Sequence, residues 1–329
     1  MVTDGGVGTA LGDASQQDAL WGAQLLFTED GNEQIQRVHR DFLSGGADIV
    51  TSASYCASYE LFSAASTFSE LPADFGKEEQ QQLEFAARKL RLSVELAMTE
   101  RDDFWDREEN RVDRIRPLVA ASLGPAGDNI TLWSGATDPD TANHSLPDAT
   151  ILDYYSRKIS ALSLAGPDLF ALESLPSSRE ACLALDALAE TAPDAPTWVT
   201  FICLDETSTS GGDSIGDAVS QVVAHSSRRG INLVACGVNC TSMNHLEALL
   251  QSARTSLPAK SGTSLICYPN SGELWDAREG ARCWHGDDDV HLDGSHALDM
   301  KNWGATVIGG CCRVTHEQIA AFRAALLVK

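Results

Sequence analysis

Residues 305–313 of the sequence read Ala-Thr-Val-Ile-Gly-Gly-Cys-Cys-Arg, a short apolar run followed by a glycine pair and two adjacent cysteines. The apolar run is typical of a buried β-strand, and Cys311 and Cys312 come just after the point where it ends. Adjacent cysteines rarely form a disulfide with each other, so the pair indicates ligands of a soft metal ion. Cys240, which closes the run Leu-Val-Ala-Cys-Gly-Val-Asn-Cys at residues 233–240, is the candidate for a third thiol ligand.

Short apolar runs of this kind alternate with longer segments of helical period along the whole chain, which predicts parallel βαβ units. We expect eight strands, at residues 2–3, 47–54, 118–123, 169–172, 198–204, 233–238, 264–268 and 305–308. Eight strand-helix pairs in 329 residues predict one domain over residues 1–329, a (β/α)8 TIM barrel with loop insertions. The expected insertions are the glutamate-rich helix 77–106 and the polar loop 127–148. A doubly wound open sheet is the alternative.

Two segments between the expected strands carry apolar residues at the spacing of a core-facing helix. One covers residues 35–43 and ends at a glycine pair, and the other covers residues 215–223. Residues 177–180 and 315–318 each fit a reciprocal helix cap, in which a hydroxyl group and a carboxylate or amide group satisfy the first turn. Each cap follows an expected strand, as a barrel requires.

The composition excludes several classes of partner. The net charge is −23 and the isoelectric point is near 4.5, so the chain repels nucleic acids and anionic membranes. Residues 1–6 lack the basic and apolar regions of a signal peptide, and no segment reaches the roughly twenty apolar residues of a membrane span. We therefore expect a cytoplasmic protein whose nine cysteines are thiols, core residues or metal ligands.

In a barrel, side chains that follow the strands converge at the C-terminal face. The residues expected there are Asp4, Glu173, Cys240, the segment 269–273, and the Cys311–Cys312 pair. Three thiolates suit Zn²⁺, with zinc to sulfur distances near 2.3 Å, and three protein ligands leave the fourth position for water or substrate. The sequence therefore predicts a catalytic type of zinc site.

Other residues that could carry chemistry fit a structural role better. His285 and His291 flank an acidic run that is typical of a solvated loop, and Asp205-Glu206 is interpreted as a loop pair. The glycine-rich segment 4–9 lacks the Lys-Ser/Thr ending of a phosphate loop. The remaining cysteines are expected in the core: Cys56, Cys182, Cys203, Cys236, Cys267 and Cys283.

With these residues in place, the chain resembles the homocysteine S-methyltransferase family from Asp4 to about Thr315. The pairing of Cys240 with the Gly-Gly-Cys-Cys-Arg segment 309–313 is the most specific mark of the resemblance. The weaker marks are Asp4-Gly5-Gly6-Val7-Gly8-Thr9, Leu20-Trp21, residues 38–55, Leu172-Glu173-Ser174-Leu175-Pro176, Gly237-Val238-Asn239 and Tyr268-Pro269-Asn270-Ser271-Gly272-Glu273.

The resemblance implies a methyltransferase with one Zn²⁺ held by Cys240, Cys311 and Cys312, where the sulfur of homocysteine takes the open position. By the same matching, Asp4 and Glu173 hold the amino group of homocysteine. A metal removes the proton of a bound thiol, so the expected reaction is attack of the thiolate on the methyl group of an onium donor, giving methionine. No further catalytic residue is expected, because a cationic donor leaves without help from an acid.

The sequence departs from the family pattern in three places, which are expected near the binding site of the methyl donor or where the first strand closes the barrel. Residues 127–135 replace the segment usual in members that use S-methylmethionine, Cys56 stands where a glutamine is frequent, and the first strand is short. We expect a small sulfonium donor, S-methylmethionine ahead of S-adenosylmethionine, with betaine as another possibility. Two alternatives stay open: a zinc and thiol binding homologue without turnover, and a methyltransferase for another thiol or selenol such as selenocysteine.

Overall fold

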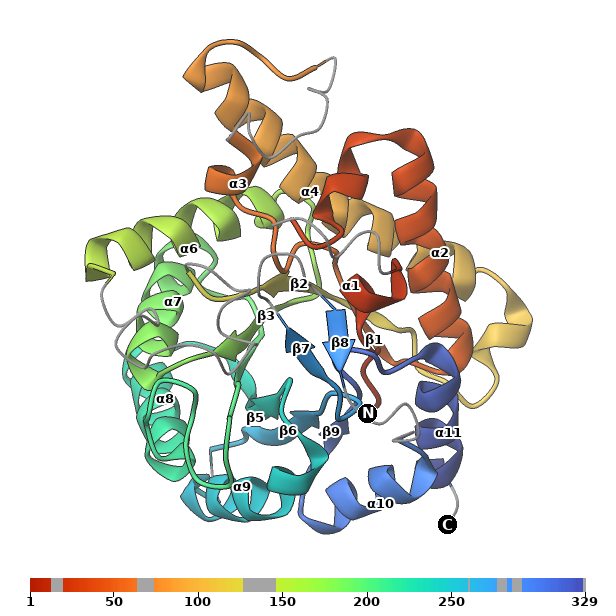
Figure 1. The fold of residues 1–329 in the computed structure, drawn as a ribbon, viewed down its shortest axis with the longest axis vertical. Coiled ribbons are helices and arrows are strands. Elements are labelled where there is room, and N and C mark those ends of the chain that lie inside the picture. The colour runs from red at the N-terminus through yellow and green to blue at the C-terminus, as the bar shows by residue number, and fades with distance from the viewer. Residues whose placement is uncertain are drawn as a thin grey trace.

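The computed structural model of the chain describes residues 1–12, 20–63, 74–126, 146–259, 261–276, 283–285 and 292–327. Its central sheet has seven parallel strands in chain order, surrounded by a ring of helices (Figure 1). The strands are β1 (Ile49–Thr51), β2 (Leu118–Leu123), β3 (Leu169–Leu175), β4 (Thr197–Phe201), β5 (Leu233–Asn239), β6 (Ser264–Tyr268) and β9 (Val307–Ile308).

The sheet closes on itself through the two residues expected to form the first strand. Val2 pairs in parallel with Ile308 of β9, and Thr3 pairs in parallel with Ile49 of β1. The backbone hydrogen bonds from Thr3 N to Ile308 O (2.8 Å) and from Asp4 N to Ile49 O (3.0 Å) join the two edges. The predicted (β/α)8 barrel is confirmed, and the alternative of an open sheet is wrong because the described strands form a closed ring. The extent of the domain, residues 1–329, stays a prediction.

Helices lie between the strands in the order that a barrel requires. None of the helices in the described ranges is long and apolar enough to cross a membrane. The bounds are α1 (Val7–Ala10), α2 (Glu29–Gly45), α3 (Tyr59–Ser63), α4 (Glu79–Trp105), α6 (Asp148–Ser163), α7 (Ser178–Thr191), α8 (Ile215–Arg229), α9 (Met243–Ser256), α10 (Gly294–Asn302) and α11 (His316–Leu327), with 3₁₀ turns at Ala23–Phe27 and Glu108–Arg111.

The helix ends agree with the sequence patterns only in part. α2 ends at Gly46 with φ of 104°, as the glycine pair predicts. At α7 the hydroxyl group of Ser177 accepts from Glu180 N (3.3 Å), but the carboxyl group of Glu180 binds Ala126 N and Tyr155 instead of closing the cap. The reciprocal cap predicted there is therefore wrong in its second half, because a tertiary contact takes the carboxylate. At α11, Thr315 N donates to Gln318 Oε1 (2.8 Å), as expected.

The expected insertion at residues 77–106 is α4, and it belongs to the helical layer. One face of α4 is buried, including Phe85, Leu90 and Val94, and it packs against α2, α6 and β2. Many of its charged side chains, such as that of Arg91, are exposed on the solvent side, whereas Glu100 and Arg101 near its C-terminal end are buried. Of the expected loop 127–148, residues 127–145 lie outside the described residues.

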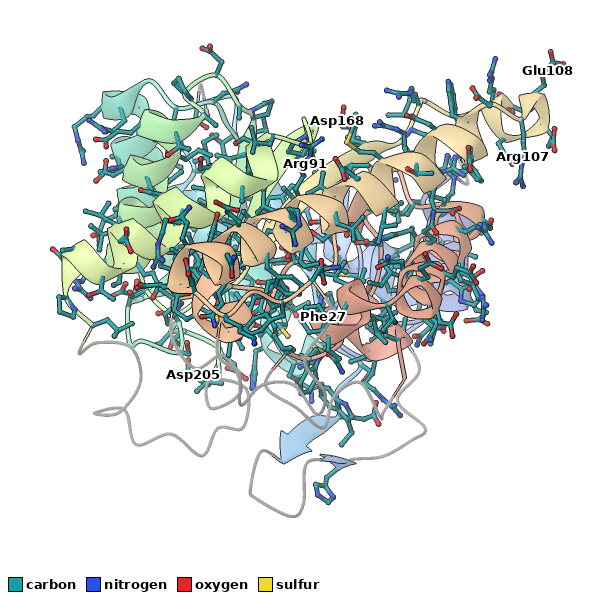
Figure 2. All side chains as sticks on the ribbon, turned by 90° about the horizontal axis from the view of Figure 1, so that it is seen from above. Phe27, Arg91, Arg107, Glu108, Asp168 and Asp205 are labelled. Carbon is teal, nitrogen blue, oxygen red and sulfur yellow. The ribbon has the colours of Figure 1, made fainter. Side chains whose placement is uncertain are left out.

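The two ends of the barrel differ. Figure 2 shows Asp168, just before β3, at one end and Asp205, shortly after β4, at the other. The antiparallel hairpin of β7 (Leu274–Asp276) and β8 (Cys283–His285) lies at the end marked by Asp205, and Figure 1 shows it over the centre of the ring. This C-terminal face is the place where barrels carry their functional groups.

Candidate metal centre and active site

The thiol groups of Cys240, Cys311 and Cys312 lie together at the C-terminal face. All three sulfur atoms are within 4.8 Å of one another, with 3.5 Å between Cys240 and Cys312 and 4.0 Å between Cys311 and Cys312. A tetrahedral zinc ion with bonds of about 2.3 Å holds its sulfur ligands about 3.8 Å apart. The separations and the all-sulfur donor set therefore fit zinc with three protein ligands. In the described ranges no other group of three or more His, Cys, Asp or Glu side chains has such an arrangement.

Backbone contacts fix the loop that carries the vicinal cysteines. Cys311 N donates to Pro269 O (2.7 Å), Gly310 N donates to Asp4 O (3.0 Å), and Ser271 N donates to Cys312 O (3.0 Å). A Cβ atom at Gly309 would overlap the hydroxyl group of Thr3, so only glycine lets the first strand approach β9 this closely. The glycine pair thus brings the cysteines next to Asp4.

Cys240 and Asn239 end β5 in an arrangement that also reaches β3. Cys240 has a φ of 52°, a left-handed conformation that turns its thiol group toward the other two. Asn239 accepts from Ser174 N (2.8 Å) and donates to Ser174 Oγ (2.7 Å), while its amide nitrogen lies 3.9 Å from Cys311 Sγ. Such partners of metal ligands fix the ligand orientation.

Asp4 and Glu173 are buried in the same cavity as the three thiol groups. One carboxylate oxygen of Asp4 accepts from Thr51 N (2.6 Å) and Thr51 Oγ1 (3.0 Å). Glu173 accepts from Ser122 Oγ at one oxygen and from Tyr268 Oη (2.9 Å) at the other. Both side chains are therefore fixed by neutral donors, and within the described ranges neither carboxylate accepts a hydrogen bond from a Lys or Arg side chain.

Burial perturbs the acid groups of this cavity. It raises the pKa of Asp4 well above the ordinary value, hydrogen bonds from Thr51 lower it, and the charge of Glu173 raises it again. Burial also raises the pKa of Glu173, against the hydrogen bonds from Ser122 and Tyr268. Two buried carboxylates that share a cavity are stabilised when a cation lies between them. The arrangement is therefore suited to an ammonium group.

An aromatic wall borders the thiol groups on another side. Trp21 and Trp284 of β8 form an edge-to-face pair with ring centroids 6.3 Å apart. Trp284 packs against the cluster formed by Ile202, Cys240 and Cys312 and also against the cluster formed by Trp21 and Cys56. Aromatic faces attract cations, so the wall is suited to a positively charged ligand next to the sulfur atoms.

Comparison with known proteins shows the family to which the chain belongs. The sequence profile of the homocysteine S-methyltransferase family matches residues 1–326. The chain belongs to the homocysteine S-methyltransferase family. The resemblance inferred from the sequence and the enzyme class, a methyltransferase, are thereby confirmed.

Individual members of this family match over nearly their whole length. Homocysteine S-methyltransferase YbgG of Bacillus subtilis (strain 168) is 32% identical over 321 residues, which cover 97% of this chain and 92% of that protein. Selenocysteine methyltransferase of Astragalus bisulcatus is 32% identical over 97% of this chain and 90% of its own length. The metallated form of the homocysteine methyltransferase MmuM from Escherichia coli has a TM-score of 0.74 at 26% identity, covering 98% of this chain and 95% of that one.

In this family member, most other cysteines are placed as expected. Cys203, Cys236 and Cys267 are buried core residues, whereas Cys182 is partly exposed and the side chain of Cys283 lies outside the described residues. Cys56 is buried as expected but also lines the cavity. His285 is exposed, His291 lies outside the described residues, and Asp205 accepts hydrogen bonds within its own loop, which agrees with a loop pair.

Sequence reasoning missed two residues that line the cavity, Ser122 and Tyr268, and one that packs beside the thiol groups, Trp284. Ser122 and Tyr268 both bind Glu173, and both stand at or next to a strand end, so the rule that found Glu173 would have found them. Trp284 carries no such signal. It reaches the sulfur atoms only because the hairpin of β7 and β8 lies over the barrel.

Proposed function

We propose that this chain is a zinc-dependent homocysteine S-methyltransferase in which Cys240, Cys311 and Cys312 hold one zinc ion. The observation that carries the proposal is the placement of three clustered thiol groups and two buried carboxylates around one cavity. Zinc bound there would supply a Lewis acid that keeps a substrate thiol deprotonated next to the methyl donor. The thiol groups themselves fit this role, since the pKa of Cys311 is raised, first by the hydrogen bond with Cys240, so a metal is needed to make it a thiolate.

Asp4 and Glu173 would hold the ammonium group of homocysteine. Each carboxylate is fixed by donors from a neighbouring strand, Thr51 for Asp4 and Ser122 for Glu173, so an amino group between them is positioned without moving either side chain. Holding the amino group leaves the sulfur end of the substrate to reach the cysteines. Such positioning lowers the entropic cost of the methyl transfer, because the substrate is already bound in the geometry that the reaction needs.

The methyl donor would approach from the side of the aromatic wall. Trp21 and Trp284 favour a cationic group, which supports an onium donor. Among such donors we propose a small sulfonium, S-methylmethionine ahead of S-adenosylmethionine. In the transfer, a lone pair of the homocysteine sulfur forms the new bond to the methyl carbon while the electrons of the old bond remain on the donor. A sulfonium donor leaves as a neutral thioether, so no acid group is required.

Incubation of the zinc-loaded protein with homocysteine and each donor separately tests the proposal. We expect methionine from S-methylmethionine at the highest rate, less from S-adenosylmethionine, and none from any donor when Cys311 is replaced by serine. Absence of methionine with S-methylmethionine, S-adenosylmethionine and betaine alike would overturn the proposed activity and favour a binding protein.

A second candidate acceptor is selenocysteine, which the similarity to the Astragalus enzyme favours. Selenocysteine also carries an ammonium group and a soft nucleophile, so the same thiol groups and carboxylates would serve it. Competition between the two acceptors for one donor decides the matter: preferential methylation of selenocysteine would make homocysteine the secondary substrate.

A further inference from the structure

A buried chain of hydrogen bonds runs behind Glu173, inside the barrel. Tyr268 Oη lies 2.9 Å from Glu173 Oε2, 2.8 Å from Thr200 Oγ1 and 3.1 Å from Trp198 Nε1. All four side chains are buried, and they come from β3, β4 and β6. Tyr268 therefore connects the carboxylate that faces the cavity to the interior of the barrel.

The donors and acceptors in this chain fix its direction. The indole nitrogen of Trp198 can only donate, so the oxygen of Tyr268 must accept from it. Tyr268 has one hydroxyl hydrogen, and an ionised Glu173 can only accept, so that hydrogen belongs to the carboxylate. Thr200 can supply a hydrogen to Tyr268 in turn. Each oxygen of Glu173 then receives one hydroxyl group, from Tyr268 and from Ser122.

We infer that Tyr268, oriented by Trp198, is a positioning residue that holds Glu173 for the amino group of the substrate and thereby selects amino thiols over thiols that lack the group. The inference rests on the proposed function, in which Glu173 binds that amino group. Ser122 alone would leave the carboxylate free to rotate about its remaining contact. A carboxylate with two fixed donors offers its outer lone pairs in one direction, toward the cavity.

Tyr155 provides a matched control. Its hydroxyl group also donates to a buried glutamate, Glu180 Oε1, at 2.8 Å, but Tyr155 and Glu180 lie on α6 and α7 and do not line the cavity. Tyr155→Phe and Tyr268→Phe thus remove the same kind of hydrogen bond from two buried pairs. Any general loss of stability should affect both variants.

Titration calorimetry on the zinc-loaded full chain tests the inference with two ligands, homocysteine and 4-mercaptobutanoate, which lacks the amino group. We expect Tyr268→Phe to weaken homocysteine binding about ten-fold, the size expected for one hydrogen bond to a charged group, and to leave 4-mercaptobutanoate binding unchanged. KM for the methyl donor should stay within about two-fold of the wild-type value. Tyr155→Phe should leave both affinities unchanged.

Equal weakening of both ligands by Tyr268→Phe would overturn the inference, because it would indicate a general change of the cavity. No change for homocysteine would overturn it as well. If Tyr268→Phe does not fold, Trp198→Phe should give a smaller loss with the same selectivity for the amino thiol, and an unselective loss would contradict the inference. The test of the inference measures binding, so it is separate from the test of the proposed function. If Tyr268→Phe weakens the binding of homocysteine alone, the inference is supported even when no donor yields methionine. If methionine is formed but the binding of both ligands is weakened equally, the proposed function holds and the inference fails.

Discussion

The surroundings of Cys240, more than its burial, distinguish it from the core thiols of the described residues. Cys236 and Cys267 are as buried as Cys240, but each lies in the apolar layer, where burial raises the pKa of Cys236 to about 12. Cys240 faces two other sulfur atoms across the cavity. The proximity of other sulfur atoms therefore distinguishes a candidate ligand cysteine from a core cysteine in this protein.

Replacement of one ligand should remove the metal without unfolding the barrel. We expect Cys311→Ser to lower the zinc content well below one per chain, because a hydroxyl group is a poor substitute for a thiolate. Cys182→Ser, on the partly exposed thiol of α7, should keep a full complement. Metal analysis of the two purified variants makes the comparison, and a full zinc content in Cys311→Ser would show that this cysteine is not a ligand.

Homocysteine binding should depend on pH through the buried carboxylates. Only an ionised carboxylate attracts an ammonium group, and burial raises the pKa of Asp4 and Glu173. The affinity should therefore be full at high pH and fall as the pH drops through these raised pKa values, of which that of Asp4 lies well above the ordinary value of an aspartate. Calorimetry from about pH 8 down to about pH 5 checks the expectation, with 4-mercaptobutanoate correcting for changes at the metal. A loss of affinity that is the same for both ligands would contradict it.

At the scale of single elements, the sequence predicts strands and strand-end residues well because both depend on local pattern. Seven of the eight expected strands occur, the first is present as two isolated bridges at Val2 and Thr3, and the residues that follow these elements meet at one face. The structure departs from the prediction where a tertiary contact decides the outcome. The carboxyl group of Glu180 binds Ala126 and Tyr155 instead of its own helix. The many polar residues of α4 suggested an insertion, although one face of this helix is buried. Trp284 could not be predicted, since its contacts depend on how the hairpin lies over the barrel.

The loop that carries Cys311 and Cys312 is tied to the loop after β6 by a chain of contacts. Arg313 Nε donates to Glu273 Oε2 (2.8 Å), Ser271 Oγ donates to the same oxygen (2.8 Å), and Ser271 N donates to Cys312 O. We expect Glu273→Gln to weaken zinc binding by up to about ten-fold, the lower end of the effects of direct ligand partners, because Glu273 acts on Cys312 through Ser271.

The control for this prediction is a similar ion pair at the other end of the barrel. Arg323 Nη1 lies 2.7 Å from Asp48 Oδ1, and Asp48 also accepts from Val2 N (2.9 Å), so Asp48→Asn should lower the melting temperature without changing zinc affinity. Competition with a chromophoric chelator measures both variants. Equal zinc affinity in Glu273→Gln and the wild type would exclude a role for Glu273 in holding the loop.

For the whole molecule, the apolar interior does not depend on the metal. The barrel is filled by residues such as Leu169, Trp198 and Ile266, and a larger apolar layer lies between the strands and the helices. We therefore expect removal of zinc by a chelator to leave the far-ultraviolet circular dichroism spectrum unchanged and to lower the melting temperature by only roughly 5 °C. Homocysteine binding should be lost and should return with zinc. Unfolding upon chelation, as in zinc fingers, would contradict this view of the barrel.

The proposed chemistry requires that the substrate sulfur joins the three cysteines at the metal. X-ray absorption at the zinc edge, recorded with and without homocysteine, counts the sulfur neighbours directly. We predict three sulfur atoms at about 2.3 Å together with one lighter atom in the free protein, and four sulfur atoms when homocysteine is bound. A spectrum that keeps three sulfur neighbours at saturating homocysteine would contradict activation of the substrate by the metal.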